Sequence, residues 1–249
     1  MMVFYVNPIL IAAAVLPALF LLRYVYRADR LEKEPAGLLV SLVLSGIVAT
    51  FAAIITEEIG ETLLAMFLPE YSTAYNVLLY FVVVALSEEG FKYLLLKKRT
   101  WNSPDFNCQF DGVVYATFVS LGFALWENIS YVAMYGLGTA AVRAVTAVPG
   151  HACFGVFMGA FYGLARRYDN FGDWSKSRQC RRLAVLVPVL LHGAYDFIAT
   201  LEFDGYAWIF VAFVAVLFLA ANRMIKTLSR DNRFIDYNND YDRYNGPEF

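Results

Sequence analysis

Residues 76–96 read NVLLYFVVVALSEEGFKYLLL, an apolar segment with Glu88, Glu89 and Lys92 inside it. A helix needs about 20 mostly apolar residues to cross a bilayer, and this segment is long enough. An ionisable side chain at membrane depth costs at least a few kcal/mol, so such groups usually face a polar cavity and serve a function. The segment therefore predicts a membrane helix that contributes to a buried polar site.

The whole chain has the composition of an integral membrane protein. Hydrophobic residues make up 59% of the chain and the mean hydropathy is +0.52, far above an ordinary soluble domain. We predict an all-α bundle of about seven transmembrane helices in one domain, residues 1–230, followed by a polar, disordered cytoplasmic tail at 231–249. The predicted spans are 3–22, 37–56, 76–96, 112–135, 147–166, 183–201 and 206–225.

The basic residues predict the orientation of this bundle. Lys and Arg follow the first, third, fifth and seventh spans, whereas the alternate joins hold almost none. By the positive-inside rule the N-terminus is outside and the C-terminus is cytoplasmic, so we expect a multi-pass protein of the cell membrane. With a net charge of −2 and no basic cluster interleaved with aromatic residues, we expect no nucleic-acid partner.

Two adjacent acids and a lysine form the most informative polar group. Glu88 lies nine residues before Lys97, or about 13 Å into the membrane at the helical rise. Glu88 and Lys92 are four residues apart and can pair along one helix face, which leaves Glu89 without a local partner. Two neighbouring buried acids repel each other, a situation that suits general-base chemistry. A purely structural role for Lys92, as a counter-ion or a snorkelling side chain, remains open.

The next span carries Glu127 and Asn128. Glu127 is a second candidate acid at membrane depth, although beside Trp126 and Tyr131 it could equally sit in an interfacial aromatic belt. Asn128 is either a supporting donor or a hydrogen-bonding contact to a neighbouring helix.

Each of the two histidines of the chain lies in a predicted span. His151 follows Pro149-Gly150, a good helix start, and shares a face with glycines at four-residue spacing (Gly155, Gly159 and Gly163). That stripe of small residues indicates close approach of another helix, which His151 then faces. His192 and Asp196 are four residues apart on one helix face, and a carboxylate beside a working histidine fixes the orientation of its ring.

Two other acidic groups are expected to be exposed. Glu57-Glu58 stands at the predicted outer end of the second span, and residues 29–35, DRLEKEP, read as a charged cytoplasmic turn. Because connecting loops usually lie on the surface, we interpret both as surface groups without a catalytic role.

Four motifs in order, Glu88-Glu89-x-x-Lys92, Phe123-x-x-x-Glu127-Asn128, His151-x-x-x-Gly155 and His192-x-x-x-Asp196, resemble the PrsW family of membrane proteases. That family is related to the CAAX prenyl endopeptidases, which carry a histidine in place of the Glu127-Asn128 motif. The resemblance extends from about residue 20 to 225, and the DRLEKEP turn is also similar to the corresponding loop of the family.

The resemblance implies a membrane protease that cleaves a single-span membrane protein, such as an anti-sigma factor, in the first step of a stress response. It implies that Glu88 and Glu89 are the catalytic acids and that His151 and His192 are the paired histidines. The supporting residues it implies are Glu127, Asn128 and Asp196. From the chemistry, we expect Glu88 or Glu89 to activate water with Lys92 tuning the pair, and His192 held by Asp196 to donate a proton, with Asn128 as a second donor. We expect the substrate to be cut near the extracytoplasmic face.

Three other functions stay open at this stage. No cofactor is expected, but His151 and His192 with Glu127 or Glu89 could form a zinc shell. The same polar residues could carry protons or ions in a transporter, although we find no inverted repeat. The chain could also be a non-catalytic binder of a peptide or a helix.

Overall fold

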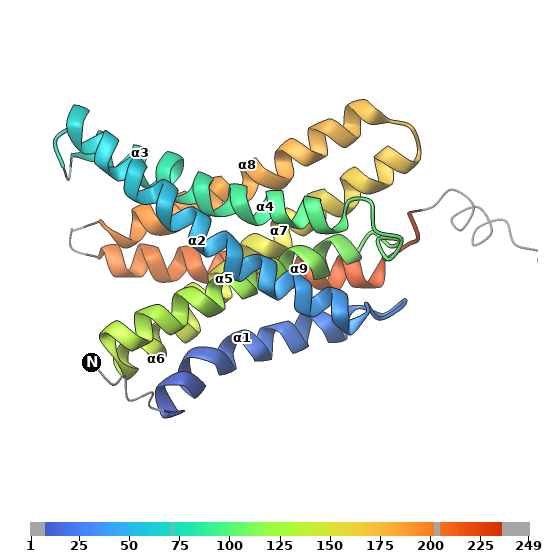
Figure 1. The fold of residues 1–249 in the computed structure, drawn as a ribbon, viewed down its shortest axis with the longest axis horizontal. Helices are drawn as coiled ribbons and strands as arrows, with labels where there is room; N and C mark the ends of the chain where they lie inside the picture. Colours follow the sequence, from blue (N-terminus) through green and yellow to red (C-terminus); the bar gives the residue numbers. More distant parts are fainter. Residues whose placement is uncertain (1–7, 71, 202–204, 236–249) are drawn as a thin grey trace, which may run out of the picture.

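The computed structural model describes residues 8–70, 72–201 and 205–235, and in this part of the chain every regular element is a helix. The long helices run side by side along the longest axis of the molecule (Figure 1). The elements are α1 (Pro8–Ala28), α2 (Ala36–Phe67), α3 (Thr73–Leu78), the π-helical segment η1 (Leu79–Val84), α4 (Ala85–Thr100), α5 (Asp111–Tyr135), α6 (Leu137–Val145), α7 (Ala147–Asn170), α8 (Trp174–Ala199) and α9 (Tyr206–Arg230).

The predicted helical membrane bundle is confirmed. Six helices in the described residues, with α6 and α7 counted together, are long and apolar enough to cross a membrane. The one remaining predicted span, 76–96, corresponds to the uninterrupted helical run α3–η1–α4, whose apolar character is broken by the charges near its middle. α3 and α6 lie at one end of the bundle, and loops 101–110 and 171–173 lie at the other (Figure 1). The orientation of the bundle in the membrane stays a prediction.

α5 is the central helix of the bundle. Within the apolar window of α5, 78% of the residues are buried in the protein, compared with 17% for α1 and 22% for α9. The outer helices instead expose apolar stripes, such as Val40, Leu44 and Val48 at four-residue spacing on α2. An apolar face of this kind is stable against lipid and not against water.

The glycine stripe of α7 packs directly on α5, which confirms the predicted close approach of another helix. A Cβ added at Gly159 would lie 2.3 Å from the Gly112 carbonyl oxygen, and one at Gly155 would lie 2.8 Å from the Ser120 hydroxyl. Only glycine allows the two backbones to approach this closely. This contact fixes α7, and therefore His151, against the part of α5 that leads to Glu127.

Some boundaries differ from the predicted ones. α2 continues eleven residues past the predicted end at 56, to Phe67, because no helix breaker interrupts the chain where the charges begin. A short helix, α6, occupies the join before α7. Residues 232–235, predicted to be part of a disordered tail, pack against the loop before α5, where Ile235 N–H donates to Asn107 O at 2.8 Å. The rest of that predicted tail, residues 236–249, lies outside the described residues.

Candidate active site

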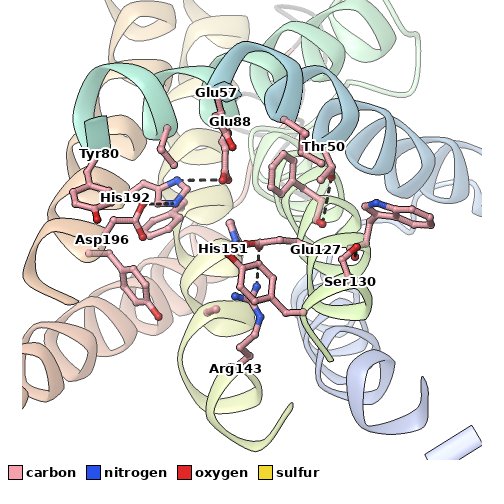
Figure 2. Close-up of a pocket in the computed structure, with 18 of the residues that line it drawn as sticks. Thr50, Glu57, Tyr80, Glu88, Glu127, Ser130, Arg143, His151, His192 and Asp196 are labelled. Atoms are coloured by element: carbon pink, nitrogen blue, oxygen red, sulfur yellow. Dashed lines mark hydrogen bonds and ion pairs between the residues drawn. The ribbon is translucent and has the colours of Figure 1, made fainter. Parts of the chain in front are cut away.

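A cavity of about 410 Å³ lies between α2, the η1–α4 run, α5, the α6–α7 region and α8. Figure 2 shows its wall, with ionisable side chains from several helices turned toward one space. Five of the residues predicted to act in the site line this cavity: Glu88, Glu127, His151, His192 and Asp196. Glu89 and Lys92 lie directly behind Glu88 and are fully buried.

The centre of the site is the ammonium group of Lys92. Its Nζ lies 3.0 Å from Glu88 Oε2, 2.7 Å from Glu89 Oε1 and 3.1 Å from His151 Nδ1. A lysine ammonium has three protons and no acceptor, so these three contacts use all its donors. Its nitrogen also lies 3.9 Å from the centre of the Phe123 ring, a favourable position for a cation. The expectation that Glu89 has no local partner is therefore wrong, because Lys92 bridges both acids.

The contacts of His151 determine the protonation of its ring. Because Lys92 can only donate, His151 Nδ1 accepts, and Nε2 carries the proton. Nε2 lies 2.8 Å from Glu127 Oε2, which also receives the Arg143 guanidinium at 2.9 Å. His151 is therefore a neutral ring held between a lysine and a glutamate, which suits it to positioning Lys92 more than to donating protons.

His192 has carboxylates on both sides of its ring. Nδ1 lies 3.0 Å from Glu89 Oε1 and 3.8 Å from Glu88 Oε2, and Nε2 lies 3.3 Å from Asp196 Oδ2. The ring also stacks on Phe154, with the centroids 4.7 Å apart, which restricts its rotation. With Nδ1–H donating to Glu89, one further proton can reside on either Nε2 or Asp196, and both of these groups line the cavity.

Local features of the helices place these groups. The π-helical segment η1 ends at Val84, one turn before Glu88, and such insertions are common at functional sites because they rotate the residues that follow. On α8, Gly193 lies against this segment, where an added Cβ would come within 2.5 Å of the Phe81 ring. The close contact keeps His192 beside α4.

Asn128 was considered as a second hydrogen-bond donor in the site, but its side chain bonds elsewhere. Its Nδ2 donates to Ala14 O at 2.7 Å, and its Oδ1 accepts from Arg143 Nε at 3.0 Å. It therefore joins α1 and α6 to α5 outside the cavity wall, as a contact between helices.

Sequence reasoning missed two charged residues of the cavity wall, Glu57 and Arg143. Glu57 was interpreted as a surface acid, which is wrong: α2 continues as a helix and turns Glu57 toward the cavity that Glu88 also faces (Figure 2), while Glu58 stays exposed. Arg143 pairs with Glu127. A lone arginine in a join otherwise almost free of basic residues was the available signal for it.

Carboxylates and imidazoles share protons in this site, and they border a cavity inside a membrane bundle. Such a site defines a membrane-embedded enzyme with acid–base chemistry. Residues 34–221 match the family described as PrsW family intramembrane metalloprotease. The chain therefore belongs to the PrsW family, and it is a multi-pass membrane protease. This membership removes the transporter and the non-catalytic binder as interpretations of the polar residues.

The sequence of this chain is similar to those of individual relatives over most of their length. The chain is 31% identical over 217 residues to Protease PrsW of Oceanobacillus iheyensis, covering 87% of this chain and 94% of that protein. It is 32% identical over 210 residues to Protease PrsW of Bacillus subtilis, covering 84% and 90%. For Protease PrsW of Halalkalibacterium halodurans the identity is 30% over 224 residues, covering 90% and 99%. No solved structure matches this chain.

The family description implies a metal ion, and the residues of the site fit one. Glu88, His151 and His192 each offer a ligand atom, and these atoms lie within 4.8 Å of one another. Two histidines and a glutamate form a common catalytic zinc shell. Glu127 and Asp196 lie behind the far nitrogens of the two rings, where carboxylates usually support zinc-binding histidines.

Proposed function

We propose that this protease hydrolyses a peptide bond of a membrane-anchored protein with water activated by glutamate and without a metal ion. The observation that carries the proposal is the position of Lys92, whose ammonium donates to one oxygen of Glu88, one oxygen of Glu89 and the only lone pair of His151 Nδ1. A buried cation that donates to both acids offsets their mutual repulsion from within the protein.

Glu88 is the base in this proposal, because it lines the cavity whereas Glu89 is fully enclosed. Glu88 removes a proton from water, the resulting hydroxide attacks the carbonyl carbon of the substrate, and a tetrahedral oxyanion forms. The pair of His192 and Asp196 faces the same cavity and supplies the proton that the leaving amine takes when the C–N bond breaks. Arg143 is the second charged donor in the cavity wall and is available to the oxyanion.

Glu89, Lys92, His151 and Glu127 act as positioning residues. Glu89 Oε1 accepts from both Lys92 and His192, so it sets the distance between the base and the proton donor. Glu127 orients His151, and His151 in turn orients Lys92. A chain of this kind keeps the reacting groups aligned before substrate arrives, which is where much of the catalytic gain arises.

The proposed substrate is a single-span membrane protein, cut near the extracytoplasmic face in a first-step cleavage such as that of an anti-sigma factor. The cavity wall includes Ser130 and Met134 from the C-terminal part of α5 and Arg143 from α6. α6 lies at the same end of the bundle as α3 (Figure 1). In the orientation expected from the basic residues, that end faces outward.

A zinc protease is the second candidate, favoured by the convergence of Glu88, His151 and His192. Those residues would hold the ion, which would supply a polarised water at neutral pH. His151 Nδ1 has a single lone pair, which cannot serve two cations, so zinc and the Lys92 ammonium compete for that nitrogen. Glu88 keeps a second oxygen, Oε1, beside the Oε2 that accepts from Lys92. The two candidates therefore differ in a measurable way.

The test is cleavage of a panel of single-span membrane proteins by the full chain purified in detergent, with and without chelator. Glu88→Gln and His192→Ala are compared with Glu58→Gln, a matched control because Glu58 is exposed on α2. We expect both site variants to lose at least about 100-fold in kcat/KM and the control to match wild type. Activity that survives chelator supports the glutamate mechanism. Activity that chelator abolishes and zinc restores would establish the zinc mechanism instead.

A further inference from the structure

Three buried carboxylates meet at the loop end of the bundle, far along α5 from the cavity. Asp29 follows α1, Glu34 precedes α2, and Asp111 begins α5; their residues are 2%, 4% and 0% exposed. One oxygen from each lies within 4.8 Å of the others. We call this group the acidic triad. It was predicted in part as a charged surface turn, which is wrong for Asp29 and Glu34.

One oxygen of two of these carboxylates is firmly held. Glu34 Oε2 accepts from the Tyr115 hydroxyl at 2.6 Å, and Asp111 Oδ2 accepts from the N–H of Cys108 at 2.6 Å and of Asn107 at 3.1 Å. These contacts fix the direction of each carboxylate. The position of the second oxygen of Glu34 and of Asp111 is therefore fixed as well.

Four remaining oxygens of the acidic triad are buried and accept no well-formed hydrogen bond: Asp29 Oδ1, Asp29 Oδ2, Glu34 Oε1 and Asp111 Oδ1. The backbone N–H groups of Arg30 and Leu31 lie close enough to interact with Asp29. The carboxyl groups of Glu34 and Asp111 lie side by side. Within the part of the chain that the structure describes, no lysine or arginine forms an ion pair with the triad; Lys33, four residues after Asp29, donates to the backbone oxygens of Tyr26 and Asp29. A buried carboxylate without a partner is costly, and three together require a compensating charge.

We infer that the acidic triad is a binding site for a hard divalent cation, Mg²⁺ or Ca²⁺. Carboxylate oxygens are the ligands that these ions select, whereas zinc prefers nitrogen and sulfur. The Cys108 thiol lies near Asp111 and Glu32, but burial raises the pKa of Cys108, which keeps it a thiol and a poor ligand. The ion would tie the α1–α2 turn to the start of α5, independently of the catalytic site.

Protonation is the competing way to neutralise the acidic triad. Burial raises the pKa of Glu34 to about 7 and that of Asp29 to about 6. If protons neutralise the acidic triad, divalent ions will not raise the midpoint of thermal unfolding. A cation-dependent increment in stability therefore separates the two accounts.

The test uses the full chain in detergent, stripped with chelator and returned to chelator-free buffer. Titration with CaCl₂, and separately with MgCl₂, is followed by calorimetry and by the midpoint of thermal unfolding. We expect one bound ion per chain and a midpoint raised by about 5 °C at saturation. The same measurements on Asp29→Asn and Glu34→Gln should show weaker binding and no increment, whereas Glu58→Gln should behave as wild type.

A parallel titration of His192→Ala separates the acidic triad from the catalytic cluster, because this variant keeps the triad and removes a candidate zinc ligand. Binding of Ca²⁺ or Mg²⁺ that persists in His192→Ala and disappears in Asp29→Asn supports the proposal. No uptake by wild type would overturn it, and so would uptake unaffected by Asp29→Asn. If Asp29→Asn does not fold, Glu34→Gln and the wild-type stoichiometry still decide the question.

Discussion

Substitution of Lys92 by methionine removes the cation at the centre of the site while keeping most of the volume of its side chain. Three acceptors lose the Lys92 donor at once: Glu88, Glu89 and His151. Of these, Glu89 still accepts from His192. Methionine cannot replace any of these hydrogen bonds, so the change isolates the charge of Lys92 from its packing.

The size of the effect follows from the distances. The contacting oxygens of Glu88 and Glu89 both lie within 3.0 Å of Lys92 Nζ, so these two oxygens are less than about 6 Å apart. At an effective dielectric constant of about 20, two like charges at that distance repel by about 3 kcal/mol. Removing one partner of a buried ion pair costs about 3–5 kcal/mol in general. We expect Lys92→Met to lower the free energy of unfolding by about 3 kcal/mol or more.

The assay is denaturant unfolding in detergent together with cleavage of a single-span substrate. Lys98→Met is the matched control, since Lys98 is exposed on the same helix, and it should stay within about 0.5 kcal/mol of wild type. We expect Lys92→Met to lose at least about 100-fold in kcat. Wild-type stability and metal-free activity in this variant would refute the role given to Lys92.

Removing one negative charge as well should restore part of the lost stability. In the double variant Lys92→Met with Glu89→Gln, the remaining acid, Glu88, borders the cavity, where water can reach it. Coupled neighbouring sites commonly show interaction energies of about 0.5–3 kcal/mol. A double variant whose loss equals the sum of the two single losses would contradict the charge argument.

Three further predictions follow from particular contacts. Gly159→Ala should destabilise the protein by about 1–3 kcal/mol in detergent unfolding, because its Cβ would meet the α5 backbone, while Gly138→Ala, with open space around it, should not. Asp196→Asn should lower kcat at least about tenfold while the protein stays folded, because His192 loses the carboxylate at Nε2. Glu57→Gln should lower kcat/KM about tenfold in the cleavage assay, whereas Glu58→Gln, which differs only in facing away from the cavity, should not.

Spacing along single helices was enough to predict much of the site. The pairs Glu88–Lys92 and His192–Asp196, each four residues apart, form the contacts expected of them. The spacing of the glycines in α7 also predicted that another helix approaches this face closely, and the structure identifies that helix as α5. These features are local, since the helical repeat alone decides which side chains share a face.

Contacts between helices could not be predicted in this way. Nothing in the order of residues indicates that His151 accepts from Lys92, because 59 residues separate them. Glu57 was misjudged for a related reason: an acid at the end of an apolar run usually marks an interface, and only the packing of α2 shows that it faces a cavity. The buried Asp29 and Glu34 were misjudged because a turn is normally solvated.

The position of Lys92 links the stability of the bundle to the choice of mechanism. If the ammonium is the working cation, Lys92→Met should lose activity and no added metal should restore it, because methionine leaves the acid pair unneutralised. If zinc is the working cation, the same substitution frees His151 Nδ1 and removes a competing positive charge beside Glu88, so activity in zinc should be kept or increased. One variant measured with chelator and with added zinc therefore discriminates between the mechanisms, and comparing its stability with wild type shows whether any loss reflects unfolding.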